Sequence, residues 1–225
     1  MTRSQKLPLL IFDLDGTLID SALDLQISMN KMLKSYGREQ VDLATLKTHI
    51  GDGLQKLVND FFPEYQLLST ENLRKVDEFL EIYENNLTVN TLLYPGVLSF
   101  LENYQGPKAL VTNKTIEPTL MIFKHFGLDQ LEWVALIGGD SLSEKKPSAL
   151  PLLHVMSKIE YSGSDTWMIG DGRPDMKSAA AAGCLKVAVH YGYSKPEELR
   201  AYSPDYVLER FSDLETLLKA QIPIF

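Results

Sequence analysis

Short apolar runs alternate with helix-forming segments over most of this chain, and the runs end in small or polar residues. The run Leu9–Phe12 ends in Asp13, and the run Thr166–Ile169 ends in Gly170 and Asp171. Buried parallel strands have this continuous apolar character because helices cover both of their faces. The alternation therefore predicts an α/β fold with a doubly wound parallel sheet.

The predicted elements follow one another regularly after the turn at Tyr94-Pro95-Gly96. Helices are expected over Val97–Tyr104, Ile116–Phe126, Ser148–Ile159, Asp175–Ala182 and Leu214–Leu218. Strands are expected over Leu9–Phe12, Ala109–Val111, Trp133–Ile137, Thr166–Ile169, Val187–Val189 and Tyr206–Leu208.

The stretch from Ser21 to about Leu92 has a different pattern, in which apolar residues recur at helical spacing and no convincing strand intervenes. Breaks between its helices are predicted near Gly37, Gly51–Gly53 and Pro63. We interpret this stretch as an all-helical insert. The predicted division is a core domain of residues 1–20 and 93–225 and a helical domain of residues 21–92.

Composition limits the partners and the compartment. The formal net charge of −8 disfavours nucleic acid and membranes as partners, but a local positive pocket would still admit a small phosphorylated metabolite. Cys184 is the single cysteine, so no internal disulfide can form, and we expect it to be a buried packing residue. Met1–Pro8 lacks the apolar stretch of a signal peptide, and no segment is long enough to span a membrane. A cytoplasmic location is predicted.

Two acidic residues stand at the end of the first strand, where ligands bind in open α/β sheets. Asp13 can attack phosphorus as a nucleophile, and Asp15 can act as a general acid and then as a base. Gly16 allows the sharp turn that follows. An Asp-Gly turn is common by itself, but it does not explain an isolated charge at Asp13.

A second acidic pair, Asp171 and Asp175, spans the end of a strand and the start of a helix. Magnesium prefers oxygen ligands, and Asp171 brought beside Asp13 would make such a site. Asp175 has an alternative interpretation, since an acid in the first turn of a helix is stabilised by the helix dipole.

Thr112, Asn113 and a pair of lysines are candidates for holding a phosphate. A hydroxyl and backbone N–H groups at a strand end can bind a phosphate oxygen. A turn or a helix N-cap is the simpler interpretation of Thr112 and Asn113 in isolation. A lysine at position 145 or 146 would offset the clustered carboxylates. Spacing alone does not choose between Lys145 and Lys146.

These motifs, in this order, resemble those of the haloacid dehalogenase superfamily of phosphohydrolases. The resemblance runs from about Leu9 to Leu218 and rests on Asp13–Leu18, Thr112, Lys146-Pro147, and Gly170-Asp171 with Asp175. It implies a Rossmann-like core in which the helical insert is an α-helical cap. The phosphoglycolate phosphatases are the most similar subgroup, on the signatures Val111–Lys114, Gly138–Asp140, Tyr94–Val97, Tyr191–Tyr193 and Ser203–Tyr206.

The resemblance also implies roles for the acidic residues. Asp13 would be the nucleophile and a ligand of Mg²⁺. Asp15 would be the acid and base, and its backbone carbonyl would also bind the metal. Asp171 would bind Mg²⁺ directly, and Asp175 would bind through water or support Asp171.

The same resemblance implies the phosphate and substrate contacts. Thr112 and the backbone of Asn113 would hold the phosphate with Lys146, which leaves Lys145 as a solvated neighbour. The specificity loop of the cap would contain His49, Gly51, Asp52 and Gly53. Asp52 can instead be the N-cap of a helix that begins at Leu54, an interpretation we slightly prefer, and His49 is expected to be structural.

The predicted function is the Mg²⁺-dependent hydrolysis of a small phosphomonoester through an aspartyl-phosphate, by a monomer or homodimer. Phosphoglycolate is the candidate substrate, although an acidic residue at Asp52 disfavours a substrate that carries a carboxylate. A sugar-phosphate mutase, a pyrophosphatase of the same fold and a non-catalytic binding module remain alternatives. A dehalogenase is disfavoured because its chemistry does not require Asp15.

Overall fold

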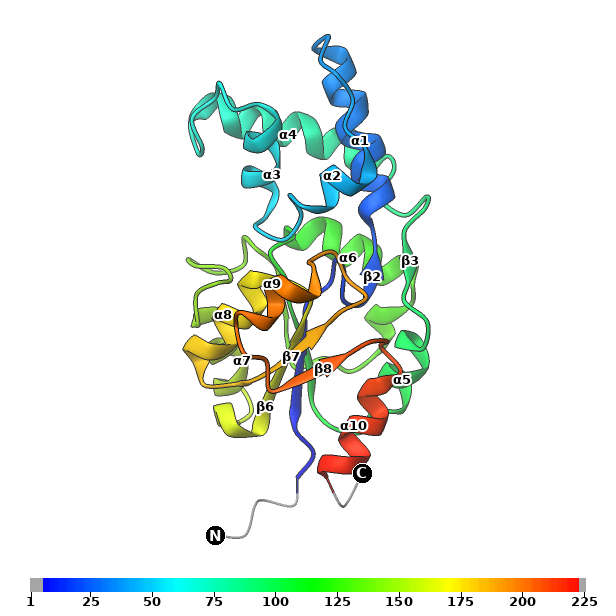
Figure 1. Ribbon diagram of the computed structural model, residues 1–225, viewed down its shortest axis with the longest axis vertical. Helices are drawn as coiled ribbons and strands as arrows, with labels where there is room; N and C mark the ends of the chain where they lie inside the picture. The colour runs from blue at the N-terminus through cyan, green and yellow to red at the C-terminus, as the bar shows by residue number, and fades with distance from the viewer. Residues whose placement is uncertain (1–5, 223–225) are drawn as a thin grey trace.

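A parallel sheet of six strands forms the centre of the computed structural model, which describes residues 6–222 (Figure 1). Its strand order is β5-β4-β1-β6-β7-β8, and every neighbouring pair is parallel. The strands are β1 (Leu9–Phe12), β4 (Lys108–Val111), β5 (Leu136–Ile137), β6 (Thr166–Gly170), β7 (Leu185–Val189) and β8 (Tyr206–Leu208). Because all six run in one direction, their carboxyl ends lie at the same edge. The predicted fold class is confirmed.

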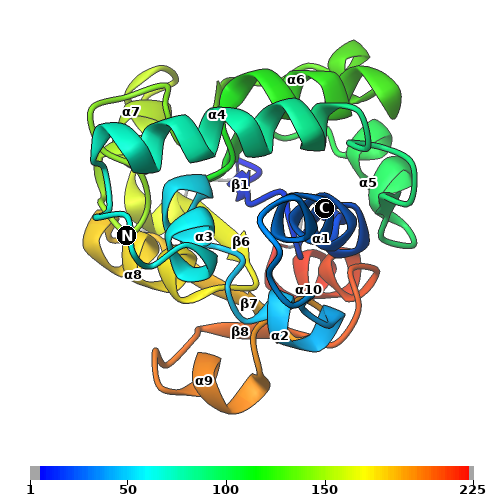
Figure 2. The same cartoon turned by 90° about the horizontal axis from the view of Figure 1, so that it is seen from above.

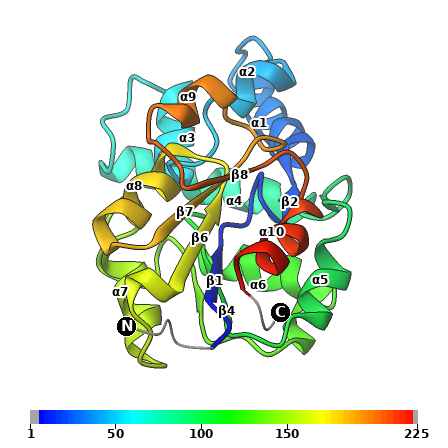
Figure 3. The same cartoon turned by 60° about the horizontal axis from the view of Figure 1, so that its bottom comes forward.

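Helices cover both faces of the sheet, as Figure 3 shows. Leu9 and Ile11 of β1 pack with helices α7 and α8, whereas Leu10 and Phe12 pack with α5, α6 and α10. None of these four side chains is exposed, because successive residues of a strand point to opposite faces and both faces are covered. The helices are α5 (Val97–Asn103), α6 (Ile116–His125), α7 (Leu150–Ser157), α8 (Arg173–Ala182) and α10 (Asp213–Gln221).

Four further helices lie beyond the carboxyl edge of the sheet, at the top of Figure 1 and toward the viewer in Figure 2. They are α1 (Ala22–Ser35), α2 (Leu43–Lys47), α3 (Leu54–Phe61) and α4 (Thr70–Glu84). The predicted breaks near Gly37, Gly51–Gly53 and Pro63 all fall between these helices. Their apolar stripes meet in a shared core that includes Met29, Leu33, Val58, Val76 and Phe79. Within residues 6–222, no helix has both the length and the apolar character that crossing a bilayer requires.

A short antiparallel ribbon joins these helices to the sheet. Strand β2 (Ile19–Asp20) leaves the sheet region and pairs with β3 (Leu92–Leu93), which returns to it. Strands of two residues are too short to produce a periodic sequence pattern, so this ribbon was not predicted. It lies at the predicted boundaries between residues 20 and 21 and between residues 92 and 93. The division of the chain into two domains at these boundaries stays a prediction.

Several element boundaries differ from the predicted ones. Strand β5 contains only the last two residues of the strand predicted over Trp133–Ile137, although the N–H of Val134 still donates to the carbonyl of Lys108 at 2.9 Å. The helix predicted from Ser148 begins at Leu150, whose N–H donates to Ser148 Oγ at 3.1 Å. Helix α9 (Pro196–Arg200) was not predicted, because one turn of helix shows no apolar stripe.

Candidate active site

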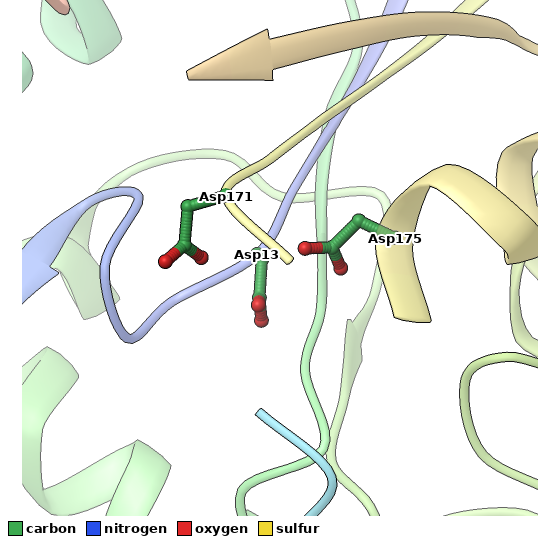
Figure 4. A group of neighbouring side chains, drawn as sticks. All are labelled: Asp13, Asp171 and Asp175. Carbon is green, nitrogen blue, oxygen red and sulfur yellow. The ribbon is translucent and has the colours of Figure 1, made fainter. Parts of the chain in front are cut away.

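Three aspartates from separate parts of the chain meet at the carboxyl edge of the sheet. Asp13 follows β1, Asp171 follows β6, and Asp175 lies in the first turn of α8. One carboxylate oxygen from each lies within 4.8 Å of the other two, and all three residues are buried. Figure 4 shows the three carboxylates gathered around a common space. The proximity of Asp13 and Asp171 that the strand ends predicted is therefore observed.

One lysine partly balances these carboxylates. Lys146 Nζ lies 2.9 Å from Asp13 Oδ1 and 2.6 Å from Asp175 Oδ1, and only 2% of the residue is exposed. Burial alone would lower the pKa of the ammonium, but the carboxylates of Asp13 and Asp175 outweigh it and raise that pKa. Lys146 is therefore held in its charged form beside Asp13.

The cluster keeps an excess of negative charge, because three carboxylates face one ammonium. Burial, followed by the charges of Asp175 and Asp13, raises the pKa of Asp171 well above its usual value. Burial and the charge of Asp13 raise the pKa of Asp175 to about 6. Buried oxygen donors with unbalanced negative charge fit a hard divalent cation, so the cluster can hold a metal ion.

Asp175 also has the structural role that its position in a helix suggested. Its Oδ2 accepts a hydrogen bond from the N–H of Gly172 at 2.9 Å, at the start of α8. The helix-terminus interpretation and the site interpretation of Asp175 therefore both describe observed contacts.

Asp15 makes contacts that the sequence did not predict. Lys114 Nζ lies 3.1 Å from both carboxylate oxygens of Asp15, and the hydroxyl of Ser21 donates to Oδ1. Burial opposes the charge on Lys114, but the carboxylate of Asp15 outweighs it and raises the pKa of the ammonium. The sequence signals for Lys114 were its position two residues after Thr112 and its place at the end of the signature Val111–Lys114, but neither gave it a role. The predicted metal contact of Asp15 uses its backbone carbonyl and stays a prediction.

Thr112 and Asn113 lie at the end of β4, beside the aspartates. The hydroxyl oxygen of Thr112 accepts a hydrogen bond from the N–H of Lys114 at 3.2 Å, so the turn that was the alternative interpretation is present. The side-chain amide of Asn113 donates to the carbonyls of Gly51 and Lys146, each at 2.9 Å. Asn113 thereby links the helical insert to the loop that carries Lys146.

The two adjacent lysines have different partners. Lys146 contacts the carboxylates, whereas Lys145 Nζ donates to the backbone carbonyl of Asp52 at 2.8 Å. Burial lowers the pKa of Lys145 despite the opposing charge of Asp52. The prediction that Lys145 is merely solvated is wrong, because it anchors the loop between α2 and α3.

The N-cap interpretation of Asp52 is also wrong. Gly53, with a φ of 93°, is the N-cap of α3, and no side-chain hydrogen bond caps this helix. The carboxylate of Asp52 instead accepts from Arg173 Nη2 at 3.0 and 2.8 Å, so its charge is neutralised. His49 Nδ1 lies 2.9 Å from Asp60 Oδ2, in agreement with its expected structural role.

A cavity of about 60 Å³ lies between the sheet edge and the helical insert. Asp13, Asp15 and Thr112 line its polar side. The opposite wall is apolar and comes from the insert, through Leu25, Ile50, Leu54, Leu57 and Leu80. Of the predicted specificity residues, His49, Gly51 and Gly53 also line the cavity, whereas Asp52 is not among the lining residues within 6–222. The cavity suits a small ligand with an anionic group.

The fold and the acidic site define a class of hydrolases, and the comparison with known proteins agrees. The family model of the haloacid dehalogenase-like hydrolases matches residues 10–189. The chain belongs to this family, and the resemblance drawn from the sequence is confirmed.

The individual relatives narrow the class further. A phosphoglycolate phosphatase of Chromobacterium violaceum is 35% identical over 214 residues, which are 92% of this chain and 95% of that protein. One from Neisseria meningitidis serogroup A / serotype 4A is 33% identical over 225 residues, which are 93% of each chain. The crystal structure of a predicted phosphoglycolate phosphatase from Haemophilus somnus 129pt superposes with a TM-score of 0.84 at 31% identity, over 96% of this chain and 99% of that one. The chain is thus an enzyme, a phosphoric monoester hydrolase similar to the phosphoglycolate phosphatases.

Proposed function

We propose that this enzyme hydrolyses a small phosphomonoester in the presence of Mg²⁺, through a phosphoryl group carried on Asp13. The observation that supports the proposal is the position of Asp13, which lines the small cavity and lies within the cluster of Asp171, Asp175 and Lys146. Phosphoglycolate is the substrate we favour, because the named relatives that cover most of the chain are phosphoglycolate phosphatases.

The contacts of Asp13 suit a nucleophile. Its Oδ1 accepts from the N–H of Leu14 at 2.7 Å and lies 2.9 Å from Lys146 Nζ. Because these contacts hold Oδ1, we assign the attack on phosphorus to Oδ2. Lys146 also places a positive charge beside this carboxylate.

The reaction we propose has two steps. In the first, a bond forms between Asp13 and phosphorus, the ester bond breaks, and Asp15 gives its proton to the departing alkoxide. In the second, water loses a proton to Asp15 and attacks phosphorus, which breaks the bond to Asp13 and releases phosphate. Thr112 and the backbone N–H of Asn113 would hold the phosphoryl oxygens during both steps.

The carboxylates of Asp13, Asp171 and Asp175 would hold Mg²⁺, with Asp175 acting directly or through water. When bound, the ion supplies positive charge to the oxygens of the transferring group. Lys146 supplies a second positive charge, and it already contacts Asp13 and Asp175.

The test is phosphate release from a panel of phosphomonoesters and pyrophosphate, with and without Mg²⁺. Wild type is compared with Asp13→Asn and with Asp77→Asn, a matched change at an exposed position on α4. We expect Mg²⁺-dependent release that Asp13→Asn abolishes and Asp77→Asn leaves intact.

Other outcomes would favour the alternatives. Release that survives in Asp13→Asn would contradict the mechanism. Little net release, with phosphoryl transfer back to a sugar phosphate, would favour a mutase, and pyrophosphate as the best substrate would favour a pyrophosphatase. A function indifferent to both Mg²⁺ and Asp13→Asn would indicate a binding module.

The compartment and the assembly remain part of the proposal. A single buried cysteine is consistent with the reducing cytoplasm, and the chain would act there as a monomer or homodimer. Size-exclusion chromatography with light scattering would distinguish the two assemblies.

A further inference from the structure

Lys114 is a buried cation to which the proposed reaction gives no role. Among the cavity-lining residues that the structure describes, it is the only lysine or arginine. Its side chain is 8% exposed, and its Nζ lies 4.8 Å from the centre of the Tyr83 ring. The rest of the wall beside it is largely apolar. A positive charge in such a place needs an anionic partner, because burial without one is costly.

The present partner of Lys114 is the group that the reaction needs. Both carboxylate oxygens of Asp15 lie 3.1 Å from Lys114 Nζ. In the proposed reaction Asp15 must turn at least one oxygen toward the ester oxygen of the substrate. Lys114 would then lose part of its ion pair while its side chain stays buried.

Within residues 6–222, the other cations around the site do not line the cavity, and Lys145 donates to the backbone carbonyl of Asp52. Lys146 contacts Asp13 and Asp175, and Arg173 contacts the carboxylate of Asp52. Asp52 is not among the cavity-lining residues within 6–222, and its carboxylate is paired with Arg173. Lys114 is therefore the cation of the cavity wall that can receive an anionic group of the substrate.

The chemistry of the substrate places that group beside Lys114. In phosphoglycolate the carboxylate is attached to the carbon that carries the ester oxygen. The group that meets the ester oxygen is Asp15, and Lys114 is in direct contact with Asp15. A carboxylate one carbon away from the ester oxygen therefore falls within reach of Lys114, and a cavity of about 60 Å³ leaves little room for a longer substituent.

We infer that Lys114 determines specificity by exchanging its ion pair with Asp15 for one with the substrate. The enzyme would thus select small phosphomonoesters that carry a carboxylate next to the ester carbon. This inference rests on the proposed phosphatase function, which it deepens by naming the chemical feature that the site recognises.

The test compares phosphoglycolate with ethyl phosphate, which has the same two-carbon length and no carboxylate. The quantity is the ratio of the two kcat/KM values, measured for wild type, Lys114→Met and Lys114→Arg. We expect wild type to prefer phosphoglycolate, Lys114→Met to reduce the ratio about 10- to 100-fold, and Lys114→Arg to retain most of it, since a hydrogen bond to a charged group has about this effect. Because both substrates meet the same protein, a loss of folded enzyme cancels in the ratio.

Three results are decisive against the inference or its basis. Equal losses for both substrates in Lys114→Met would show that Lys114 only positions Asp15, and would overturn the inference while the phosphatase function stands. Equal kcat/KM values of wild type for phosphoglycolate and ethyl phosphate would overturn the inference. This result needs no variant, so it holds even if Lys114→Met does not fold. No release by wild type from any phosphomonoester would instead contradict the proposed function.

Discussion

Replacing Asp24 by alanine should remove hydrogen bonds that hold the start of α1 against the segment that returns to the sheet. Asp24 lies in the first turn of α1 with none of its surface exposed. Its carboxylate accepts from the N–H groups of Asn90 and Thr91 at 2.9 and 2.8 Å, from the side-chain amide of Asn90 at 2.8 Å and from the hydroxyl of Thr91 at 2.7 Å. These donors immediately precede β3, where the chain returns to the sheet.

The cost can be worked out donor by donor. Asn90 is exposed, so water can replace the carboxylate there, and the hydroxyl of Thr91 has a second acceptor in the carbonyl of Leu87 at 3.1 Å. The N–H of Thr91 has neither alternative, because Thr91 is only 3% exposed. One buried N–H without a partner costs about 1–3 kcal/mol, and the weakened bonds to the other donors add about 1 kcal/mol. We therefore expect Asp24→Ala to reduce the free energy of unfolding by about 2–4 kcal/mol.

Urea unfolding followed by two probes measures this effect. Both tryptophans, Trp133 and Trp167, lie outside the insert, so their fluorescence reports on the sheet region, whereas far-ultraviolet circular dichroism reports on all helices. Coincident transitions justify a two-state value. Asp77→Ala, on the exposed face of α4, should change the free energy by less than about 0.5 kcal/mol. A cost for Asp24→Ala as small as that of the control would refute the reasoning.

Two further predictions concern a glycine and the cysteine. Gly16→Ala should reduce activity at least about tenfold and cost about 1–2 kcal/mol, because φ is 80° and a Cβ would lie 2.2 Å from Asp171 Oδ2. Gly37 has a φ of 64°, and a Cβ added there would have no neighbour within 4 Å, so Gly37→Ala should lose similar stability and keep full activity. Equal activities in the two variants would contradict the proposed clash at Gly16. Burial raises the pKa of the Cys184 thiol to about 12, so at about pH 8 it should react with a disulfide reagent only when the protein unfolds. Above about pH 8.5 the thiol of the unfolded chain loses its proton first. The free energy of unfolding should therefore fall by up to about 1.4 kcal/mol per pH unit until the folded thiol also ionises. Fast labelling of the folded protein would contradict this prediction, because it would show that the thiol is accessible.

The errors of the sequence analysis share a physical cause. An N-cap at Asp52 was a sound local interpretation, but Arg173, 121 residues away, provides a charged partner for that carboxylate. Lys145 was interpreted as solvated, and its contact with the Asp52 carbonyl joins groups 93 residues apart. Lys114 was not singled out, although it pairs with Asp15 across 99 residues. Long-range polar contacts leave no periodic pattern in the sequence, so local reasoning does not find them.

The sequence by itself determined the parallel sheet, the helical insert and the meeting of Asp13 with Asp171. Apolar runs must be buried, parallel strands end at one edge, and a polar residue that follows such a strand is therefore delivered to that edge. Spacing did not choose between the two adjacent lysines, and only the resemblance assigned Lys146. The tertiary structure shows that Lys146 faces the carboxylates, because packing directs the two side chains to different partners. It also placed Lys114 beside Asp15 in the wall of a cavity, because the helices that complete this wall come from a distant part of the sequence.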